Sequence, residues 1–572
     1  MTYLIRVASG VAFAAALGFA GVGGAMAGNT LSGAYLAGLH AAKIGDLDAA
    51  AKYFGRALDR DPGDLALMEQ TLLYQAAAGR VDQAMDLAER LIVFDANNRI
   101  ATLLLTAQEL KTGEYRAALD RIEAAGGGFH PLIGSMIGAW AKFGLGDAAG
   151  GEAALNGLGE RPVFRVFTLY HTGLMRHADN DPEGAVEAYA QLGEKLSTPT
   201  GRVASAYAAA LIDARKRDEA RAVYEAAEAL TVGDGALEAE IAAFDAGAQP
   251  APLVETPAEG AAEALFGLAA ALGDDGDTRL TLLYARLATW LRPDLYNATL
   301  LVAELLDSNN QNEAAIRAYE SIPPDSPLAR SAEIGRAEAL HRLGRNDEAA
   351  EALKSLTRRA PGMADAFIAL GDLLRRGENY NEAAKAYASA IDLMEAAGRP
   401  NWVLFYQRGI AYERAGEWDE AEADFLTALE MQPDQPLVLN YLGYSWLEKG
   451  MNIDEAMAMI RKAVDQRPED GYIVDSLGWG HYLLDEFPAA VRAVELQPID
   501  PVVNDHFGDA LWRVGRRLEA EFQWRRALSF DPAEKDRERI RRKLDIGLDA
   551  VLEEEEAAAA ARSAPVSSAN DG

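Results

Sequence analysis

Small residues recur at a fixed spacing along the C-terminal half of the chain. In four consecutive units a glycine stands in an apolar stretch, an alanine follows about a dozen residues later, and a proline closes the unit. The units contain, in order, Gly409, Ala421 and Pro433; Gly443, Ala456 and Pro468; Gly478, Ala490 and Pro498; and Gly508, Ala520 and Pro532. The interval from Gly409 to Gly443 is 34 residues, the length of a two-helix repeat unit. This spacing favours stacked helix pairs, an architecture that presents a long binding surface.

The residue types explain why this spacing predicts helix pairs. A glycine and an alanine at the crossing allow two antiparallel helices to approach closely, because neither has a bulky side chain. Gly416 lies where the first helix of its unit must end, and Pro433 cannot continue the second. One pair alone cannot bury its apolar stripe, so neighbouring pairs must stack. No long stretch alternates with period two, and the sequence therefore predicts an all-α fold.

The pattern resembles the tetratricopeptide repeat (TPR), which implies an α-solenoid of stacked antiparallel helix pairs forming a superhelix. Further units begin near Leu31, Arg330 and Ala364. Weaker copies occur near Leu65, Arg99, Phe164, Arg202, Ala262 and Tyr296. The alternative is an ordinary all-helical bundle in which the periodicity is accidental.

Two intervals depart from the repeat length. Gly371 and Gly409 are 38 residues apart, which predicts a lengthened helix pair around MEAAGRPNW. Gly478 and Gly508 are 30 residues apart, which predicts a second helix shortened by about one turn at Ala490–Gln497.

The chain divides into several predicted segments. Residues 246–258 (AGAQPAPLVETPA) are rich in proline and alanine and predict a linker or loop between two arrays. The N-terminal array, residues 28–245, is degenerate and rich in glycine, whereas residues 259–532 form the C-terminal TPR array. A charged capping helix is expected at 533–561, followed by a disordered tail at 562–572.

The N-terminal residues, 1–27, predict a cleavable secretory signal peptide. Arg6 supplies the positive charge, Val7–Ala20 is apolar, and Ala25-Met26-Ala27 matches a cleavage pattern that leaves Gly28 first. A retained membrane anchor is the alternative. The expected location is the periplasm, with no membrane insertion after cleavage. A peripheral position at the cell envelope is a second option.

Composition excludes several classes of function. The formal net charge is −33, which disfavours nucleic acid as a partner because phosphate binding needs a basic surface. No cysteine is present, which excludes disulfides, thiolate zinc sites, a cysteine nucleophile and a lipid-modified cysteine. Basic residues nevertheless crowd the region 513–543, where we expect ion pairs along helix faces or, as the alternative, a contact patch for an acidic partner.

The sequence does not predict an enzyme. None of the seven histidines has a partner at the spacing of a metal-binding helix motif. Asp505-His506 and Asp475-Ser476 suggest a catalytic triad, but no nucleophile turn or oxyanion loop accompanies them. No nucleotide-binding loop is present either, so we expect no cofactor and no bound metal.

A peptide-binding groove is the better hypothesis. The resemblance implies that positions 2, 5, 9, 12 and 13 of each first helix line the concave face of the superhelix. In this sequence the candidate groove residues are Tyr406, Asn440, Tyr444, Tyr472, Asp475, Trp479, Tyr482, Asp505, Asp509, Trp512 and Arg513. Aromatic rings supply buried area and polar groups fix a peptide backbone, although several of these rings could instead pack between helices.

The segments LNYLGYSWLEKG, GYIVDSLGWGHYL and VNDHFGDALWRVGRRLEAEFQWRRAL resemble a narrower group. They are similar to the outer-membrane TPR lipoproteins that act as adaptors for periplasmic carboxyl-terminal processing proteases. The resemblance covers roughly residues 262–545 and implies a non-catalytic adaptor that binds partner proteins and recruits substrates to such a protease. A structural scaffold of an envelope assembly or polysaccharide-export machine is the alternative, and an enzyme with an unrecognised site is the remote one.

Overall fold

The computed structural model describes residues 30–126, 131–158, 162–193, 201–230, 235–273, 277–494 and 501–563. The chain forms two compact units, Met1–Pro361 (unit 1) and Gly362–Gly572 (unit 2). Within the described residues the secondary structure is helical, with no strand. The predicted all-α fold is therefore confirmed.

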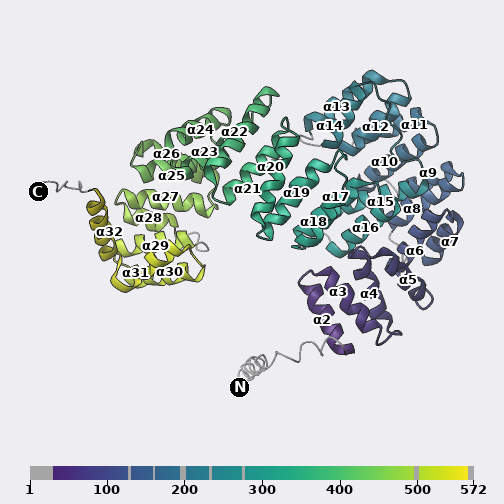
Figure 1. Ribbon diagram of the computed structural model, residues 1–572, viewed down its shortest axis with the longest axis horizontal. Helices are drawn as coiled ribbons and strands as arrows, with labels where there is room; N and C mark the ends of the chain where they lie inside the picture. Colours follow the sequence, from purple (N-terminus) through teal and green to yellow (C-terminus); the bar gives the residue numbers. More distant parts are fainter. Residues whose placement is uncertain are drawn as a thin grey trace, which may run out of the picture. The chain divides into compact units, whose positions relative to one another are not determined.

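Among the described residues of unit 2 there are five consecutive helix pairs and two further helices, drawn in green to yellow in Figure 1. The pairs are α21 (Ala364–Arg376) and α22 (Tyr380–Ala396); α23 (Trp402–Ala415) and α24 (Trp418–Met431); α25 (Pro436–Lys449) and α26 (Ile453–Gln466); α27 (Gly471–Leu483) and α28 (Phe487–Val494); and α29 (Pro501–Arg513) and α30 (Arg517–Ser529). The last two helices are α31 (Glu534–Ile546) and α32 (Leu548–Ser563).

The glycines of the repeat lie where the two helices of a pair cross. A Cβ atom added to Gly409 would lie 2.7 Å from the ring of Phe425 in α24. One added to Gly371 would lie 2.7 Å from the ring of Tyr387 in α22. The predicted close approach of paired helices is confirmed, and it depends on the missing side chain.

The longer interval corresponds to a helix of unusual length. α22 has 17 residues, whereas α24 and α26 have 14 each. α28 is described as far as Val494, and residues 495–500 lie outside the described residues, so the shortened second helix at Ala490–Gln497 stays a prediction. The end of the chain differs from the single capping helix expected at 533–561, because Gly547 adopts φ 86° and separates α31 from α32.

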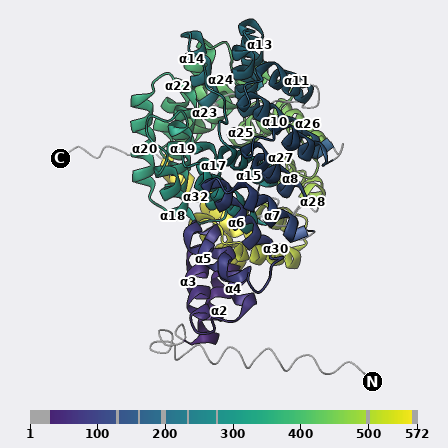
Figure 2. The ribbon, with the colours of Figure 1, turned by 90° about the vertical axis from the view of Figure 1, so that its right-hand side faces the viewer.

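Unit 1 begins with a series of helix pairs, shown in purple to teal in Figure 1 and from another side in Figure 2. They are α2 (Leu31–Lys43), α3 (Leu47–Leu58), α4 (Leu65–Ala77), α5 (Val81–Leu91), α6 (Arg99–Thr112), α7 (Tyr115–Ala125), α8 (Pro131–Gly144), α9 (Ala148–Asn156), α10 (Pro162–Ala178), α11 (Pro182–Gly193), α12 (Gly201–Asp213) and α13 (Arg217–Leu230). The later helices are α14 (Gly235–Asp245), α15 (Pro257–Leu272), α16 (Thr278–Leu291), α17 (Tyr296–Ser308), α18 (Asn312–Glu320), α19 (Ala329–Arg342) and α20 (Asn346–Arg359).

The pair α15–α16 returns to the start of unit 1. α15 packs on α6, α8 and α10, and α16 packs on α4, α5 and α6. α4, α6, α8 and α10 are first helices of their pairs, so α15 and α16 pack mainly on first helices of unit 1. Trp290 of α16 donates a hydrogen bond to Asp82 (3.0 Å), and Lys111 donates to the Trp290 carbonyl oxygen (2.5 Å).

This packing places the division of the chain elsewhere than the sequence suggests. Residues 246–256 carry no helix, and α15 begins at Pro257 behind a Thr256 capping box. The boundary between the compact units nevertheless lies at Pro361–Gly362, so residues 259–361 belong with the N-terminal helices and not with a C-terminal array. The reason is physical: α15 and α16 bury their apolar faces against helices that precede the loop.

Candidate functional site

First helices of consecutive pairs carry the candidate groove residues. Tyr406 lies on α23, Asn440 and Tyr444 on α25, and the remaining residues on α27 and α29. α25 contacts α27 directly, and α27 contacts α29. Stacking of the first helices therefore brings side chains from separate repeat units onto one surface of unit 2.

Three rings form a stack on this surface. The Trp479 ring lies 4.9 Å from Tyr482 at an interplanar angle of 7°, and 4.1 Å from the His506 ring at 18°. The indole nitrogen of Trp479 donates a hydrogen bond to Glu448 of α25. All three rings are half-buried, and burial raises the pKa of the Tyr482 hydroxyl to about 12. The stack joins α27 to α29 and leaves ring surface accessible.

His506 is oriented by a buried acid. Its Nδ1 lies 2.9 Å from Oδ2 of Asp475, and the Asp475 side chain is buried. Burial alone would lower the pKa of His506, but the carboxylates of Asp475, Asp505 and Asp509 outweigh it and raise the pKa above its usual value. The arrangement is not a catalytic triad, since the hydroxyl of Ser476 donates to the Tyr472 carbonyl oxygen of its own helix (2.9 Å).

Asp505 and Asp509 bind a lysine from the end of the chain. Nζ of Lys543, on α31, lies 2.8 Å from Asp505 Oδ2 and 2.7 Å from Asp509 Oδ2. The Lys543 residue is 1% exposed. Asp509 also accepts a hydrogen bond from the Trp524 indole (2.9 Å), and burial, together with the charge of Asp509, raises the pKa of Asp505. These two acids therefore have partners within the chain.

Trp512 and Arg513 also contact neighbouring elements. Trp512 donates its indole hydrogen to Asp549 of α32 (3.0 Å), and a Cβ on Gly547 would lie 2.8 Å from its ring. The Arg513 guanidinium lies 4.5 Å from the Phe487 ring centre and 3.7 Å from Asp485. The C-terminal helices thus cover the last repeat pair.

The other candidates divide between helix seams and open surface. The Tyr406 ring packs 6.1 Å from Phe425 and 6.0 Å from Tyr441, so it belongs to the seam between pairs. Tyr444 is half-buried, and burial raises its pKa well above the usual value. Asn440 is half-buried with its Oδ1 atom shielded from solvent, whereas Tyr472 is 67% exposed.

Glu448, His506 and Lys543 contact these residues but are not among the groove residues predicted from the repeat. The repeat register could have identified Glu448, because it lies one helical turn after Tyr444. It could not have paired Lys543 with Asp509, which is 34 residues away in another helix. Elsewhere in the basic region, Arg516 pairs with Glu519 (2.7 Å) and Arg525 with Glu521 (3.0 Å), as the interpretation of helix-face ion pairs predicts.

Other polar groups were considered as chemical sites. Across the described ranges, no group of three or more His, Asp or Glu side chains is arranged to hold a metal ion. His171 is buried in unit 1, where it accepts a hydrogen bond from Trp140 (3.1 Å), and burial lowers its pKa to about 4. His177 lies 2.9 Å from Asp213. These histidines have structural partners.

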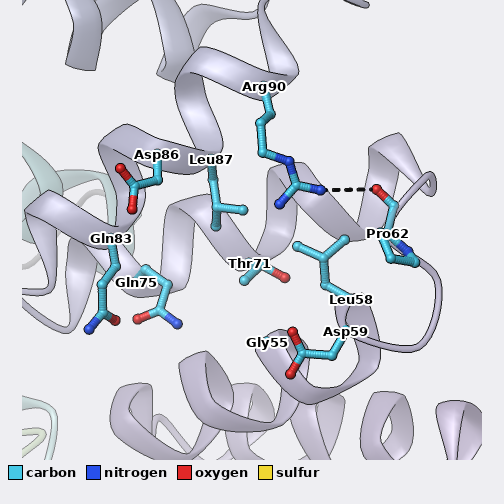
Figure 3. A pocket seen from close by; sticks show the side chains of 10 residues that line it. All are labelled: Gly55, Leu58, Asp59, Pro62, Thr71, Gln75, Gln83, Asp86, Leu87 and Arg90. Carbon is cyan, nitrogen blue, oxygen red and sulfur yellow. Dashed lines mark hydrogen bonds between the residues drawn. The ribbon is translucent and has the colours of Figure 1, made fainter.

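A shallow cavity of about 410 Å³ lies between α3, α4 and α5 (Figure 3). Arg90 points across its rim and donates to the Pro62 carbonyl oxygen (3.2 Å). The other lining residues are Gly55, Leu58, Asp59, Thr71, Gln75, Gln83, Asp86 and Leu87. The mixture of isolated acids, amides and aliphatic groups indicates no particular chemistry.

Known proteins provide further comparisons. A family model described as tetratricopeptide repeat matches residues 35–99, 300–364, 334–398 and 406–471. The chain is 31% identical over 110 residues to a TPR repeat-containing protein of Pseudomonas aeruginosa. The match covers 18% of this chain, and the chain spans 18% of the length of that relative.

Solved structures with a similar fold include a tetratricopeptide repeat protein of Parabacteroides merdae, at 15% identity and a TM-score of 0.37, covering 44% of this chain and 98% of that chain. Another is the APC/C hetero-tetramer Cut9–Hcn1, at 12% identity and a TM-score of 0.37, covering 92% of this chain and 98% of that chain. Separately, no helix among the described residues is long and apolar enough to cross a membrane.

Proposed function

We propose that this tetratricopeptide-repeat protein is a non-catalytic scaffold of the bacterial cell envelope. Its unit 2 binds extended segments of partner proteins and recruits substrates to a periplasmic carboxyl-terminal processing protease. Tetratricopeptide repeats bind other proteins or peptides, which supports the general part of the proposal. The apolar N-terminal stretch and Ala25-Met26-Ala27 support export.

The observation that carries the proposal is the stack of Trp479, Tyr482 and His506. Glu448 and Asp475 hold two of these rings in fixed orientations through hydrogen bonds. Rings fixed before binding lose little conformational entropy when a partner arrives. The ring surface that stays accessible in these half-buried residues can cover apolar side chains of a peptide.

The series of repeat pairs in unit 2 ends at α29 and α30. α31 and α32 cover the last repeat pair, where Lys543 binds Asp505 and Asp509 and Trp512 binds Asp549. The proposed peptide surface therefore comprises Asn440, Tyr444, Tyr472, Trp479 and Tyr482, with Glu448 and His506 as supporting residues.

Co-purification of the full chain from a periplasmic fraction tests the proposal. We expect a serine protease of the carboxyl-terminal processing class and its substrates to be recovered, and the Trp479→Ala variant to lose about tenfold or more of the bound material. Trp418→Ala, which alters a tryptophan at the start of α24, is the matched control and should retain the partners.

Other results of these experiments would favour a different function. Recovery of envelope-assembly or polysaccharide-export subunits in place of a protease would favour the structural scaffold. Hydrolysis of a substrate by the purified chain without a partner would refute the non-catalytic role. Trp479→Ala should keep the fold, with a limited loss of melting temperature because the half-buried ring contacts Tyr482 and His506; a large loss would place the ring in the core.

A further inference from the structure

A second cavity lies in unit 1, where helices from the start of the chain meet helices about 250 residues later. Its volume is about 360 Å³, within the range of small-molecule sites. The lining residues come from α3, α16, α17, α18 and the turn after α4. They are Leu47, Asp48, Ala78, Gly79, Arg286, Leu306, Gln311, Ala314, Arg317, Ala318 and Ser321.

The guanidinium of Arg286 is the unusual group in this cavity. Its Nε atom is shielded from solvent and has no hydrogen-bond partner among the described residues. Burial lowers the pKa of Arg286 to about 10; Asp48 partly opposes this shift, and Arg317 adds to it. Arg286 as a whole is half-buried, and desolvating a charged group that forms no ion pair costs free energy.

Gly79 makes room for this guanidinium. A Cβ atom added to Gly79 would lie 3.1 Å from Cζ and 3.2 Å from Nε of Arg286. Gly79 also has φ 84°, a conformation that favours glycine. The turn after α4 therefore holds the planar group against backbone.

Positive charge exceeds negative charge around the cavity. Arg317 lies 3.4 Å from Asp48, and Arg80 lies 2.7 Å from the same carboxylate. Among the described lining residues Asp48 is the one carboxylate; it forms ion pairs with Arg80 and Arg317 and offsets the charge of Arg286 only in part. This local excess of guanidinium groups contrasts with the net charge of −33 of the whole chain.

The two neutral polar lining residues, which flank α18, already have partners. The Gln311 amide donates to the Gly45 carbonyl oxygen, and the Ser321 hydroxyl donates to the Ala318 carbonyl oxygen (2.7 Å). Neither supplies an acceptor that neutralises Arg286.

We propose that this cavity binds a small molecule through an oxyanion, a phosphate or carboxylate group, held by Arg286 with Arg317 beside it. A guanidinium presents a planar fork that pairs with two oxygens of such a group. The ligand would join α16 and α18 to α3 and the turn after α4. Because the cavity exists only when these distant helices are packed together, binding stabilises folded unit 1.

Titration calorimetry and thermal unfolding of the full chain test this site, with inorganic phosphate and citrate as probes at constant ionic strength. We expect saturable binding of at least one probe and a rise in melting temperature. Binding of phosphate but not citrate identifies a phosphoryl ligand, and the reverse identifies a carboxylate ligand. Neither probe binding the wild-type protein would overturn the proposal.

Variants separate binding from a structural role. Arg286→Met should weaken the bound probe by about tenfold or more. It should not lower the melting temperature of the unliganded protein, because it removes a desolvated charge that Asp48 offsets only in part. Arg279→Met is the control on the same helix, where Arg279 already pairs with Asp277 (2.7 Å), and it should leave probe affinity unchanged.

Equal affinity in Arg286→Met and wild type contradicts the proposal, as does a lower unliganded melting temperature in that variant. If Arg286→Met does not fold, probe binding to the Arg317→Gln variant tests the site instead. We expect it to weaken the probe severalfold, and unchanged affinity would count against the site.

Discussion

At the scale of single residues, the buried ion cluster of unit 2 is the most consequential contact. Lys543 lies between Asp505 and Asp509, and Arg539 lies 3.7 Å from Asp509. Such clusters are stable only while each buried charge keeps its partner. Asp505 and Asp509, which the sequence predicts as groove residues, therefore bind α31 through Lys543.

Replacing Lys543 tests this role. Lys543→Met should lower the free energy of unfolding of unit 2 by about 3–5 kcal/mol, because Asp505 and Asp509 would keep their charges in a buried site. Urea denaturation followed by circular dichroism measures the change. Lys535→Met, at an exposed position on the same helix, is the control. A loss no greater than that of the control would refute the structural role.

His506 gives unit 2 a dependence on pH. Its raised pKa means that the folded state binds the proton more tightly than the unfolded state. The resulting stabilisation is fully present below the unfolded value of about 6.5 and is lost as pH rises through the higher folded value. Urea denaturation at several pH values should show that His506→Gln costs more stability at pH 5.5 than at pH 9. A difference of opposite sign would contradict the assignment, and histidine NMR titration measures the pKa directly.

At the scale of helices, the repeat register determines how each pair packs. Gly443 shows this in α25, where an added Cβ would lie 2.9 Å from the Ala456 carbonyl oxygen and 3.0 Å from Ile460. This carbonyl oxygen belongs to the backbone of α26, which cannot move aside as a flexible side chain can. A larger residue at position 443 must therefore push α25 and α26 apart.

Gly443→Leu should therefore destabilise unit 2 by about 1–3 kcal/mol or more. Chemical denaturation of the full chain measures this loss. Gly362→Leu is a useful comparison, since an added Cβ there meets nothing within 4 Å. We expect little change in the comparison variant, and similar stabilities for both would show that the crossing tolerates bulk.

At the scale of the whole molecule, the two compact units use their first helices differently. In unit 2 the first helices carry the proposed peptide surface. In unit 1 the equivalent helices α4, α6, α8 and α10 are covered by α15 and α16 from the same chain. α15 approaches α8 so closely that a Cβ on Gly260 would overlap the Trp140 ring.

Gly260→Leu should detach α15 from α8 and lower the stability of unit 1 by about 1–3 kcal/mol or more. Limited digestion with a non-specific protease should then cleave faster near residues 246–256, the non-helical segment before α15. Gly267→Ala changes the same helix where an added Cβ would lie an ordinary 3.6 Å from Phe167, and it should digest like the wild type. Unchanged digestion of Gly260→Leu would show that α15 does not need this close contact.

Local spacing was enough to predict the helix pairs and the lengthened one among them. Gly371, Gly409 and Gly443 mark helix crossings, and the longer interval corresponds to the long α22. The sequence also held an unused signal for the packing inside unit 1. α8 is apolar on every face (PLIGSMIGAWA), which indicates a helix enclosed on all sides and not one at an open surface.

The candidate groove was only partly predictable. The register identified Trp479 and Tyr482, because positions along a first helix follow from the repeat. It could not distinguish them from Asp505, Asp509 and Tyr406, whose surroundings come from other helices.

The sequence by itself determined the repeating helix pair, since helix ends and crossings depend on residues within one repeat length. Tertiary structure alone decided which surfaces stay open. Lys543 binds α31 to the last repeat pair of unit 2, and α15 and α16 cover first helices of unit 1. Arg286 contacts Gly79, which is more than 200 residues away in the chain. These contacts join side chains that are far apart in the chain, and no local pattern of residues encodes which distant helix will cover a given face.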